Sequence, residues 1–546
     1  MVQPDLLISL ARADQLRKMS RWGEAAGIYS EWLNYNPASS SVVLNFALCL
    51  LALGRYAEAS KQSARIPVDD PNCWRAKVIY ARAQLAEGKV EVALQSLREV
   101  LEYNPADVDI ALELANTLLQ YVGDAAGARQ VVAPFIEGEG YREAALQTYI
   151  VASLYDRVES DSSLVERILS FAANVMSHSA EIKPQVTRNS HGRMRVGLIS
   201  GYFCVSPVYF LTYSVLEQLS KKFDLIFYDR GSKKDWAHGK FEGIASEWVD
   251  VDQANPDKLH HTLRAGHLDA LFEMAGWSDV EVLKAIADRP CPKIFKWVGG
   301  QSATTGMTVF DGFISDSLQT PLETQDYYTE PLVNLESGYV AYTPPDYLPG
   351  LVQPRKDVLL LGVVGNPVKI TASYLEEIAK VITAAAKKIP VPIVLQFIDT
   401  RYREKIVCQR ISEALRCYFD NSSRVAVLYT YPVSHKDFLT HVGKLSAVID
   451  TWPYSAGLTA LEALAMGVPV LGKPGTLCSG RHAVSHQFFA TRGLSMKKFS
   501  LAGLTSVAKM AEKPRKLAGF AKSARCRPDK VALALGKLIE CDSLSG

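Results

Sequence analysis

A short segment recurs along the first quarter of the chain at almost constant spacing. The segments SRWGEA, GRYAEA, GKVEVA and GDAAGA begin, at intervals of 34, 34 and 35 residues, at Ser20, Gly54, Gly88 and Gly123. Prolines recur at the interval of 34 as well, at Pro37, Pro71 and Pro105. Such a period constrains the fold strongly, because each unit must bury its apolar face against neighbours of the same kind. The pattern predicts a stack of helical pairs.

Each unit has a small residue between two helical patterns, an alanine near the start of the second pattern and a proline after it. In these features it resembles the tetratricopeptide repeat. A plain helical bundle is the alternative, but a bundle has no reason to keep one period through four units. The resemblance implies an α-solenoid whose concave face receives an extended partner peptide. We therefore expect repeats that dock a polypeptide over residues 1–135, followed by a helical connector over 136–190.

Beyond residue 190 the helical period gives way to short apolar runs typical of buried parallel strands. They include the runs RVGLISGYF (195–203), FDLIFYD (223–229) and DGFISDS (311–317). A proline-rich break at 342–357 precedes a second series, which begins with VLLLGVVG at 358–365. Alternation of such runs with amphipathic stretches is typical of a parallel α/β sheet. We predict two Rossmann-like domains, 191–350 and 351–546, with a ligand cleft beyond the carboxyl ends of their strands.

The composition excludes several classes of protein. The chain is 48% apolar and 22% charged, with a formal net charge of +2, which argues against a dedicated nucleic-acid or membrane-surface binder. The first five residues lack the basic flank and apolar core of a signal peptide, and no early apolar run is long enough to span a bilayer. Nine scattered cysteines include no CxxC pair, so neither a zinc site nor a disulfide framework is indicated. We expect a cytoplasmic protein.

The most informative segment of the second series is AVIDTWPYSAGLTALEALAMGVPVLGKPG. It predicts a strand over 447–452, a loop, a helix over 458–466 and a strand over 468–473. Thr459 and Glu462 share the first turn of this helix. The helix N-terminus and a hydroxyl could bind phosphate oxygens, while the carboxylate could accept hydrogen bonds from ribose hydroxyls. Spacing alone leaves open the alternative that both residues only cap the helix.

The same segment resembles the signature of the TPR-containing protein O-GlcNAc transferase and SPINDLY-like glycosyltransferase family, in which it binds the UDP part of the donor. Further matches occur in the right order in RMRVGLISGYF, DRPCPKIFKWVGGQSATTGMTVFDGFISDS and YYTEPLVNLESGYVAYTPP. The resemblance extends over nearly the whole chain. It implies a bacterial member with a GT-B fold after the repeats. It also implies inverting, metal-independent transfer of a sugar from UDP-GlcNAc or a similar nucleotide sugar to a polypeptide side chain, without a further cofactor.

The resemblance also implies roles for individual residues. Lys369, in GNPVKI, falls where the family has the lysine that contacts the donor diphosphate, with Asn366 as a neighbouring polar contact. A cation is useful there, because the leaving diphosphate gains negative charge as the glycosyl bond breaks. Thr304 and Thr305 fall on the acceptor side. The other implied donor-site residues are Phe438, His441, Gly457, Leu458, Thr459, Glu462 and Arg481, with Ser485 at the border of the cleft.

One departure from the family pattern lies near the reacting sugar. The family usually reads DFxxHP after the first strand, whereas this chain reads YFCVSP, with Ser206 in place of the histidine and Tyr202 in place of the aspartate. We place Ser206 with Lys369 among the catalytic candidates. If donor phosphate oxygens or nearby carboxylates deprotonate the acceptor instead, Ser206 is only a polar wall of the sugar pocket. Two alternatives stay open. One is a flagellin or adhesin glycosyltransferase with another activated sugar, including the N-glucosyltransferase type, and the other is a catalytically inactive TPR scaffold.

Overall fold

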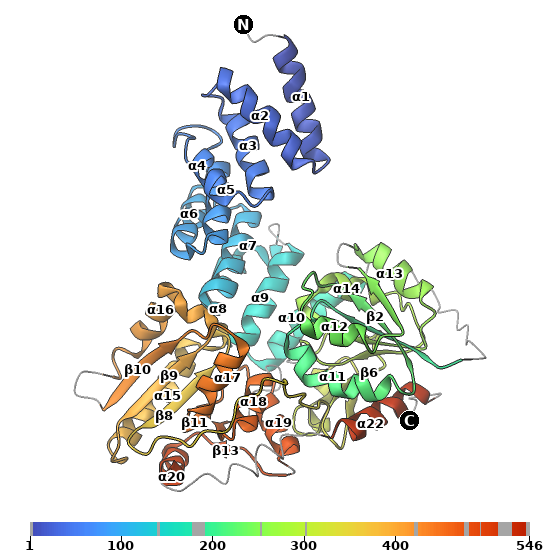
Figure 1. Ribbon diagram of the computed structural model, residues 1–546, viewed down its shortest axis with the longest axis vertical. Coiled ribbons are helices and arrows are strands. Elements are labelled where there is room, and N and C mark those ends of the chain that lie inside the picture. Colours follow the sequence, from blue (N-terminus) through green and yellow to red (C-terminus); the bar gives the residue numbers. More distant parts are fainter. Residues whose placement is uncertain are drawn as a thin grey trace. The chain divides into compact units, whose positions relative to one another are not determined.

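The computed structural model describes residues 4–138, 142–176, 192–251, 254–300, 303–419, 424–473, 475, 480–491, 493–511 and 527–541. The chain divides into two compact units, Met1–Tyr149 and Ile150–Gly546. Figure 1 shows helices throughout the first unit and a mixture of strands and helices in the second. This order of helical repeats and parallel sheets confirms the predicted fold class. The finer limits at residues 135, 190 and 350 stay predictions.

The first unit is built from consecutive helix pairs. Their bounds are α1 (Pro4–Lys18), α2 (Trp22–Tyr35), α3 (Ser40–Ala52), α4 (Tyr56–Ser63), α5 (Cys73–Ala86), α6 (Val90–Tyr103), α7 (Val108–Thr117) and α8 (Ala125–Val132). A π-helical turn, η1 (Leu118–Val122), extends α7, and a 3-10 turn, η2 (Ala133–Phe135), follows α8. Each helix packs against the next one along the chain. Helix α9 (Glu143–Tyr155) crosses the division between the two units.

The repeated segment forms the turn inside each pair and the start of the second helix. Its first residue has a positive φ in all four copies, of 57°, 74°, 77° and 72° at Ser20, Gly54, Gly88 and Gly123. Glycine adopts this conformation without steric cost, which explains why three of the four copies carry it. The last residue of each segment is a fully buried alanine, at Ala25, Ala59, Ala93 and Ala128. The sequence period is therefore the period of a left-handed turn followed by a close helix contact.

The second unit begins its α/β part with a parallel sheet. Among the described residues this sheet has seven strands in the order β3-β2-β1-β4-β5-β6-β7. The strands are β1 (Arg195–Ser200), β2 (Asp224–Asp229), β3 (Glu247–Asp250), β4 (Ala270–Glu273), β5 (Ile294–Lys296), β6 (Gly312–Ser315) and β7 (Leu332–Asn334). The helices are α10 (Asp161–Met176), α11 (Pro207–Leu219), α12 (Trp236–Glu242), α13 (Pro256–Ala265) and α14 (Val280–Ile286). The strand order reverses at β1 and β4, where open sheets of this kind place their ligands.

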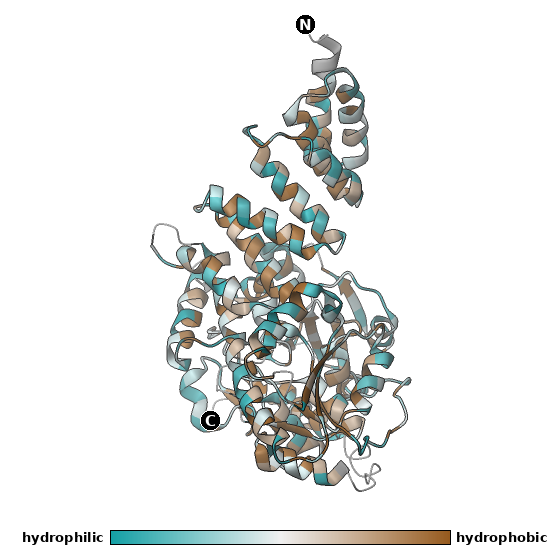
Figure 2. Cartoon of the chain, turned by 90° about the vertical axis from the view of Figure 1, so that its left-hand side faces the viewer, coloured by the Kyte–Doolittle hydropathy of each residue, from teal (hydrophilic) through white to brown (hydrophobic). Residues whose placement is uncertain are grey.

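A second parallel sheet follows, with six strands in the described part of the chain, in the order β10-β9-β8-β11-β12-β13. The strands are β8 (Leu359–Val364), β9 (Ile393–Ile398), β10 (Val425–Thr430), β11 (Ala447–Ile449), β12 (Val470–Gly472) and β13 (Lys497–Lys498). The helices are α15 (Ala372–Ala386), α16 (Lys405–Leu415), α17 (His435–Gly443), α18 (Leu458–Ala465), α19 (His482–Ala490), α20 (Leu501–Ala511) and α22 (Pro528–Glu540). Figure 2 shows hydrophobic residues along strands of the sheets, as expected for strands buried on both faces.

The two sheet domains of the second unit are joined by the C-terminal helix. Helix α22 follows the second sheet in sequence but packs against α11 of the first, and Figure 1 shows the two helices side by side. Lys293, before β5, donates a hydrogen bond of 2.5 Å from its Nζ to the carbonyl of Ile539 in α22. Leu535 and Ile539 are fully buried. The crossing of α22 therefore fixes the second domain to the first through apolar burial and a charged hydrogen bond.

Candidate functional site

A buried carboxylate organises the loop between β11 and α18. Asp450 is 1% exposed and accepts hydrogen bonds from the backbone N–H of Thr451 (2.8 Å), the hydroxyl of Ser455 (2.9 Å) and the N–H of Ala456 (2.7 Å). Burial raises the pKa of Asp450 to about 7, against these hydrogen bonds. The strand ends at Ile449 rather than at residue 452, because the chain turns here to surround the carboxylate.

Lys369 reaches this loop from the end of β8. It ends a 3-10 turn, η6 (Pro367–Lys369), and its Nζ donates to the carbonyl of Ser455 at 3.2 Å. The ammonium also lies 4.7 Å from the ring centroid of Tyr454, a cation–π distance. Burial lowers the pKa of Lys369 to about 8, although Asp450 opposes the shift. Two strand ends thus bring a cation and a loop of backbone polar groups together.

The start of α18 lies beside the same strand end. Gly365 follows β8 with a φ of +110°, and a Cβ built on it would lie 3.6 Å from the Cγ2 atom of Thr459. Gly457 is the residue before Leu458, the first of the helix, and no side chain caps this N-terminus. The donor-binding roles of Thr459 and Glu462, and the alternative in which they only cap the helix, both stay predictions.

Asn366 stabilises the turn that carries Lys369. Its Oδ1 atom accepts a hydrogen bond of 3.1 Å from the N–H of Val368. This contact positions the lysine within a three-residue turn. The predicted contact of Asn366 with the donor stays a prediction.

Glu462 is held by a histidine that the sequence did not single out. The carboxylate is 2% exposed, and its Oε1 atom lies 2.6 Å from Nε2 of His435. The other ring nitrogen of His435, Nδ1, lies 2.8 Å from the hydroxyl of Tyr347. The ring of Phe210, in α11, has its centroid 4.8 Å from that of His435. The structure therefore joins the second sheet domain to the first at this carboxylate.

Two residues of α17 that the resemblance implied differ in their placement. Phe438 stacks on His435, the residue that binds Glu462, at 6.0 Å between ring centroids. His441 instead lies 3.5 Å from Asp437, one turn earlier on the same helix. A spacing argument could have found His435, because it lies three residues before Phe438 on the same helical face.

Helix α19 and the residue before it contact the first sheet domain. The backbone N–H of Arg481 donates to Oε1 of Gln319 at 2.9 Å, and the Nε atom of Arg481 is buried with no hydrogen-bond partner among the described residues. The hydroxyl of Ser485 donates to Oδ2 of Asp316 at 2.5 Å. Asp316 follows β6 of the first sheet domain, and burial raises the pKa of its carboxyl group. Ser485 thus lies at the border between the domains, with its hydroxyl bound to an aspartate.

Two further histidines of α19 meet a tyrosine of the first sheet domain. The hydroxyl of Tyr339 lies 3.0 Å from Nδ1 of His482 and 3.2 Å from Nε2 of His486. The Nδ1 atom of His486 lies 3.3 Å from the carbonyl of Gly457. Burial lowers the pKa of His486 to about 4 and the pKa of His482 well below its usual value. Both rings are therefore neutral at physiological pH.

The threonines expected on the acceptor side are buried. Thr304 and Thr305 are each 1% exposed, and both hydroxyls donate to the carboxylate of Glu330, at 2.6 Å from Thr304. Burial raises the pKa of Glu330. In this structure the two hydroxyls bind a buried carboxyl group and do not face an open surface. Their role toward an acceptor stays a prediction.

Ser206 caps the helix that follows β1. Its Oγ atom accepts from the N–H of Val208 at 3.1 Å and donates to the carbonyl of Tyr202 at 2.7 Å. The residue is partly exposed and stands just before Pro207, the first residue of α11. This geometry gives Ser206 a structural function, and its place among the catalytic candidates stays a prediction.

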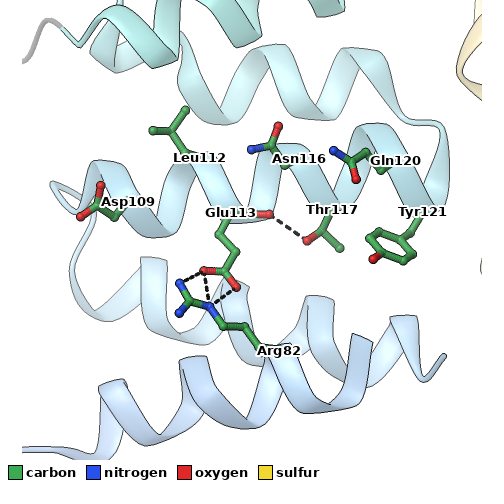
Figure 3. Close-up of a pocket in the computed structure, with 8 residues that line it drawn as sticks. All are labelled: Arg82, Asp109, Leu112, Glu113, Asn116, Thr117, Gln120 and Tyr121. Atoms are coloured by element: carbon green, nitrogen blue, oxygen red, sulfur yellow. Dashed lines mark hydrogen bonds and ion pairs between the residues drawn. The ribbon is translucent and has the colours of Figure 1, made fainter. Parts of the chain in front are cut away.

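The first unit carries a separate open groove of about 470 Å³. Arg82 of α5 lies on one side of it, and Figure 3 shows its guanidinium directed at the carboxylate of Glu113, 2.7 Å away. The groove is lined by Arg82, Asp109, Leu112, Glu113, Asn116, Thr117, Gln120 and Tyr121. Most of the lining side chains are polar, and they are either uncharged or, like Arg82 and Glu113, joined in an ion pair. Such a lining suits an extended polypeptide with free backbone amides.

Comparison with known proteins finds similarity to glycosyltransferases over part of the chain. Residues 164–349 match Glycosyl transferase family 41, and residues 16–85 and 84–135 match a tetratricopeptide repeat family. A relative from Eustoma exaltatum subsp. russellianum, named probable UDP-N-acetylglucosamine–peptide N-acetylglucosaminyltransferase SPINDLY, is 27% identical over 54% of this chain. Its counterpart in Arabidopsis thaliana is 27% identical over 53% of this chain. The chain spans about a third, 32%, of the length of each of these relatives.

A solved structure has the same fold over nearly the whole chain. It is a single-residue mutant of an O-GlcNAc transferase from Thermobaculum terrenum, with a TM-score of 0.71 and 21% sequence identity, covering 99% of this chain and 95% of that one. The resemblance predicted from the sequence, to O-GlcNAc transferases and SPINDLY, is confirmed by these matches, and so is the GT-B fold. No helix in the described part of the chain is long and apolar enough to cross a membrane.

Proposed function

We propose that this chain is a protein glycosyltransferase of the family 41 type, which transfers a sugar from UDP-GlcNAc or a similar nucleotide sugar to a polypeptide side chain. The observation that carries the proposal is the position of Lys369. Its ammonium lies at the carboxyl end of a strand, bound to a loop that leads into the N-terminus of α18. A cation and a helix N-terminus are both suited to a diphosphate.

The donor occupies the cleft at the carboxyl ends of β8 and β11 in this proposal. The diphosphate lies between Lys369 and the first turn of α18, on the side of Thr459 and of Arg481, whose Nε atom has no hydrogen-bond partner in the described part of the chain. Glu462 accepts hydrogen bonds from the ribose hydroxyls, and His435 holds its carboxylate in place. Asn366, Phe438 and His441 complete the expected donor side. The buried and hydrogen-bonded state of Glu462 supports this role, since a fixed carboxylate loses little entropy on binding.

The mechanism that fits this arrangement is a single displacement with inversion at the anomeric carbon. The acceptor oxygen forms a bond to that carbon while the bond to the diphosphate breaks and its electron pair leaves with the diphosphate. Lys369 stabilises the charge that develops on the leaving group, which removes the need for a metal ion or another cofactor.

The repeats serve as the acceptor-docking part in this proposal. Solenoids of this kind bind extended peptides along one face, and the groove between α5 and α7 offers amide and hydroxyl groups for backbone contacts. Docking and chemistry would then lie on different units of the chain.

Two other functions make different predictions. A flagellin or adhesin glycosyltransferase would use the same cleft with another activated sugar. A TPR scaffold without catalytic activity is suggested by Ser206, which stands where the family has a histidine. Isothermal titration with UDP and measurement of UDP release from UDP-GlcNAc and UDP-glucose separate these cases. We expect UDP to bind and one donor to be consumed, and consumption to cease in Lys369→Ala. A protein that binds no UDP, or turns over equally in Lys369→Ala, would contradict the proposal.

A further inference from the structure

The hydrogen bonds around Tyr339 fix the proton positions on two histidines. A carbonyl oxygen only accepts, so the contact of 3.3 Å between Gly457 and His486 requires the proton of His486 on Nδ1. Because the ring of His486 is neutral, its Nε2 atom then accepts, and the hydroxyl proton of Tyr339 points to it at 3.2 Å. The hydroxyl oxygen of Tyr339 is left to accept from Nδ1 of His482 at 3.0 Å.

This series of hydrogen bonds leaves the Nε2 atom of His482 as a free hydrogen-bond acceptor among the described residues. Its Nδ1 atom carries the proton, so in the neutral ring Nε2 holds an unshared electron pair. No described residue donates a hydrogen bond to this Nε2 atom. Gly480 packs against this side of the ring, since a Cβ atom built on it would lie 2.5 Å from Nε2. A side chain at residue 480 would displace the His482 ring, and the φ of +80° at this position also favours glycine.

The same ring lies beside the lysine of the donor cleft. The centroids of the rings of His482 and Tyr454 are 6.1 Å apart, and the Lys369 ammonium lies 4.7 Å from the same Tyr454 ring. The hydroxyl of Ser455 accepts a hydrogen bond of 2.9 Å from the N–H of Ala483, next to His482, while its carbonyl binds Lys369. The charge of Lys369 contributes to the lowered pKa of His482, as expected for close neighbours.

Resting on the proposed function, we propose that His482 is the proton acceptor of the transfer reaction, in the role left open by Ser206. The acceptor hydroxyl oxygen bonds to the anomeric carbon, the bond to the diphosphate oxygen breaks, and the hydroxyl proton moves to Nε2 of His482. The resulting imidazolium is stabilised by the Tyr339 oxygen, and it releases its proton to water after UDP leaves. The hydroxyl of Ser206 is already bound to Val208 and Tyr202, whereas Nε2 of His482 is free of any donor among the described residues.

The donor itself makes this base stronger. Without ligand, burial and the ammonium of Lys369 disfavour the imidazolium. A bound diphosphate adds negative charge next to both groups, and an opposite charge close to an imidazole raises its pKa. The described titratable groups that face His482 are Tyr339, His486, Lys369 and Tyr454. Proton transfer to a positioned base contributes roughly 100- to 10,000-fold to the rate.

The first test compares wild type with His482→Asn, in which an amide N–H near the Nδ1 position can still bind Tyr339. We expect UDP release from the active donor to fall by roughly 100-fold or more, while UDP affinity by titration calorimetry stays the same. Added imidazole should restore part of the rate in His482→Ala, which a merely structural residue would not allow. The control is His260→Asn, a buried histidine bound to the carbonyl of Ala285. Full activity in His482→Asn would overturn the proposal.

The second test needs no turnover and therefore distinguishes this proposal from the proposed function. Diethylpyrocarbonate modifies unprotonated imidazole nitrogens, and mass spectrometry of peptides from the full chain reports each histidine. We expect His482 to be modified faster than His486, whose two nitrogens are both bound. Added UDP should protect His482 and leave His260 unaffected. A His482 that resists the reagent, or reacts equally with and without UDP, would overturn the proposal even if transfer is observed.

Discussion

At the scale of single residues, the cleft combines a lysine and a carboxyl group whose pKa values are both brought close to neutral pH by burial. The pKa of Lys369 is lowered to about 8, and the pKa of Asp450 is raised to about 7. Each group favours the charged form of the other, but desolvation is the larger cause for both. A bound diphosphate would supply a negative counter-charge that stabilises the ammonium form of Lys369. Donor binding should therefore be coupled to proton uptake by this lysine.

This coupling predicts a pH dependence of UDP affinity. Below pH 8 the ammonium of Lys369 is mostly charged, and as the pH rises through about 8 it loses its proton. Affinity for UDP should weaken above that pH by up to about tenfold per unit. Titration calorimetry from about pH 7 to about pH 9.5 measures this slope. In Lys369→Arg the guanidinium stays charged, so the slope should disappear. An equal slope in both proteins would show that another group titrates.

Ser206 allows a second prediction about a single side chain. Since its hydroxyl caps α11, Ser206→Ala should lower the free energy of unfolding by about 1 kcal/mol. The rate of sugar transfer should fall only modestly, because the hydroxyl is already occupied by local hydrogen bonds. Urea unfolding and a UDP-release assay measure the two effects. Ser206→Asp, which keeps the cap, should retain stability. A loss of activity as complete as that of Lys369→Ala would instead make Ser206 catalytic.

At the scale of elements, the repeats depend on one left-handed residue in each turn. Ser20 occupies this position in the first repeat with a φ of 57°, where the later repeats have glycine. An L-residue pays about 1 kcal/mol or more for this conformation. The first helix pair therefore carries a strain that the others avoid.

Substitutions at these turns should act in opposite directions. Ser20→Gly should stabilise the repeats, and Gly88→Ala should destabilise them by about 1 kcal/mol, because a Cβ at Gly88 meets no atom within 4 Å and only the backbone is strained. The matched control is Gly27→Ala, in the interior of α2 with equal free space, which should stabilise the helix by about 1 kcal/mol. Urea unfolding of the full chain measures all three. A neutral Gly88→Ala would contradict this account of the period.

Elements and their order follow from local patterns, whereas the site depends on contacts between distant segments. The repeat period and the apolar runs predict the helix pairs and both sheets, because they are set by neighbours within about 40 residues. Asp450 lies within the segment that predicts the donor site. Its role in organising the loop depends on N–H groups of that loop, and no local sequence pattern predicts the conformation of the loop. Tyr339 and His482 are 143 residues apart and meet only when the two domains pack. The resemblance places Thr304 and Thr305 on the acceptor side, and their hydrogen bonds to Glu330 are visible only in the folded structure.

At the scale of the whole molecule, the proposal separates docking from chemistry. Asn116 and Gln120 line the groove of the first unit, whereas Lys369 and Glu462 belong to the second. Variants of the groove should therefore change the use of a protein acceptor without changing donor binding. This separation can be tested in the full chain, without removing any part of it.

Asn116→Ala combined with Gln120→Ala should raise the KM for a protein acceptor severalfold to tenfold or more, since each lost hydrogen bond contributes about 0.5–1.5 kcal/mol. The affinity for UDP and the release of UDP in the absence of acceptor should stay unchanged. Gln95→Ala, on α6 outside the groove, serves as the control. Kinetics with one purified acceptor, followed by mass spectrometry, measure the effect. A groove variant with the KM of wild type would remove the docking role.

The central claim is that this chain transfers a sugar to protein and that Lys369 stabilises the leaving diphosphate. Mass spectrometry of an acceptor co-expressed with wild type or with Lys369→Ala tests it most directly, with Lys380→Ala as the control for an exposed lysine. Removal of such a charge-stabilising group costs roughly 100- to 1,000-fold in rate. The account predicts a glycan mass on the acceptor with wild type and Lys380→Ala, and at most a trace, reduced by roughly 100-fold or more, with Lys369→Ala. A glycan that forms at the wild-type level in Lys369→Ala, or that never forms with wild type, would contradict it.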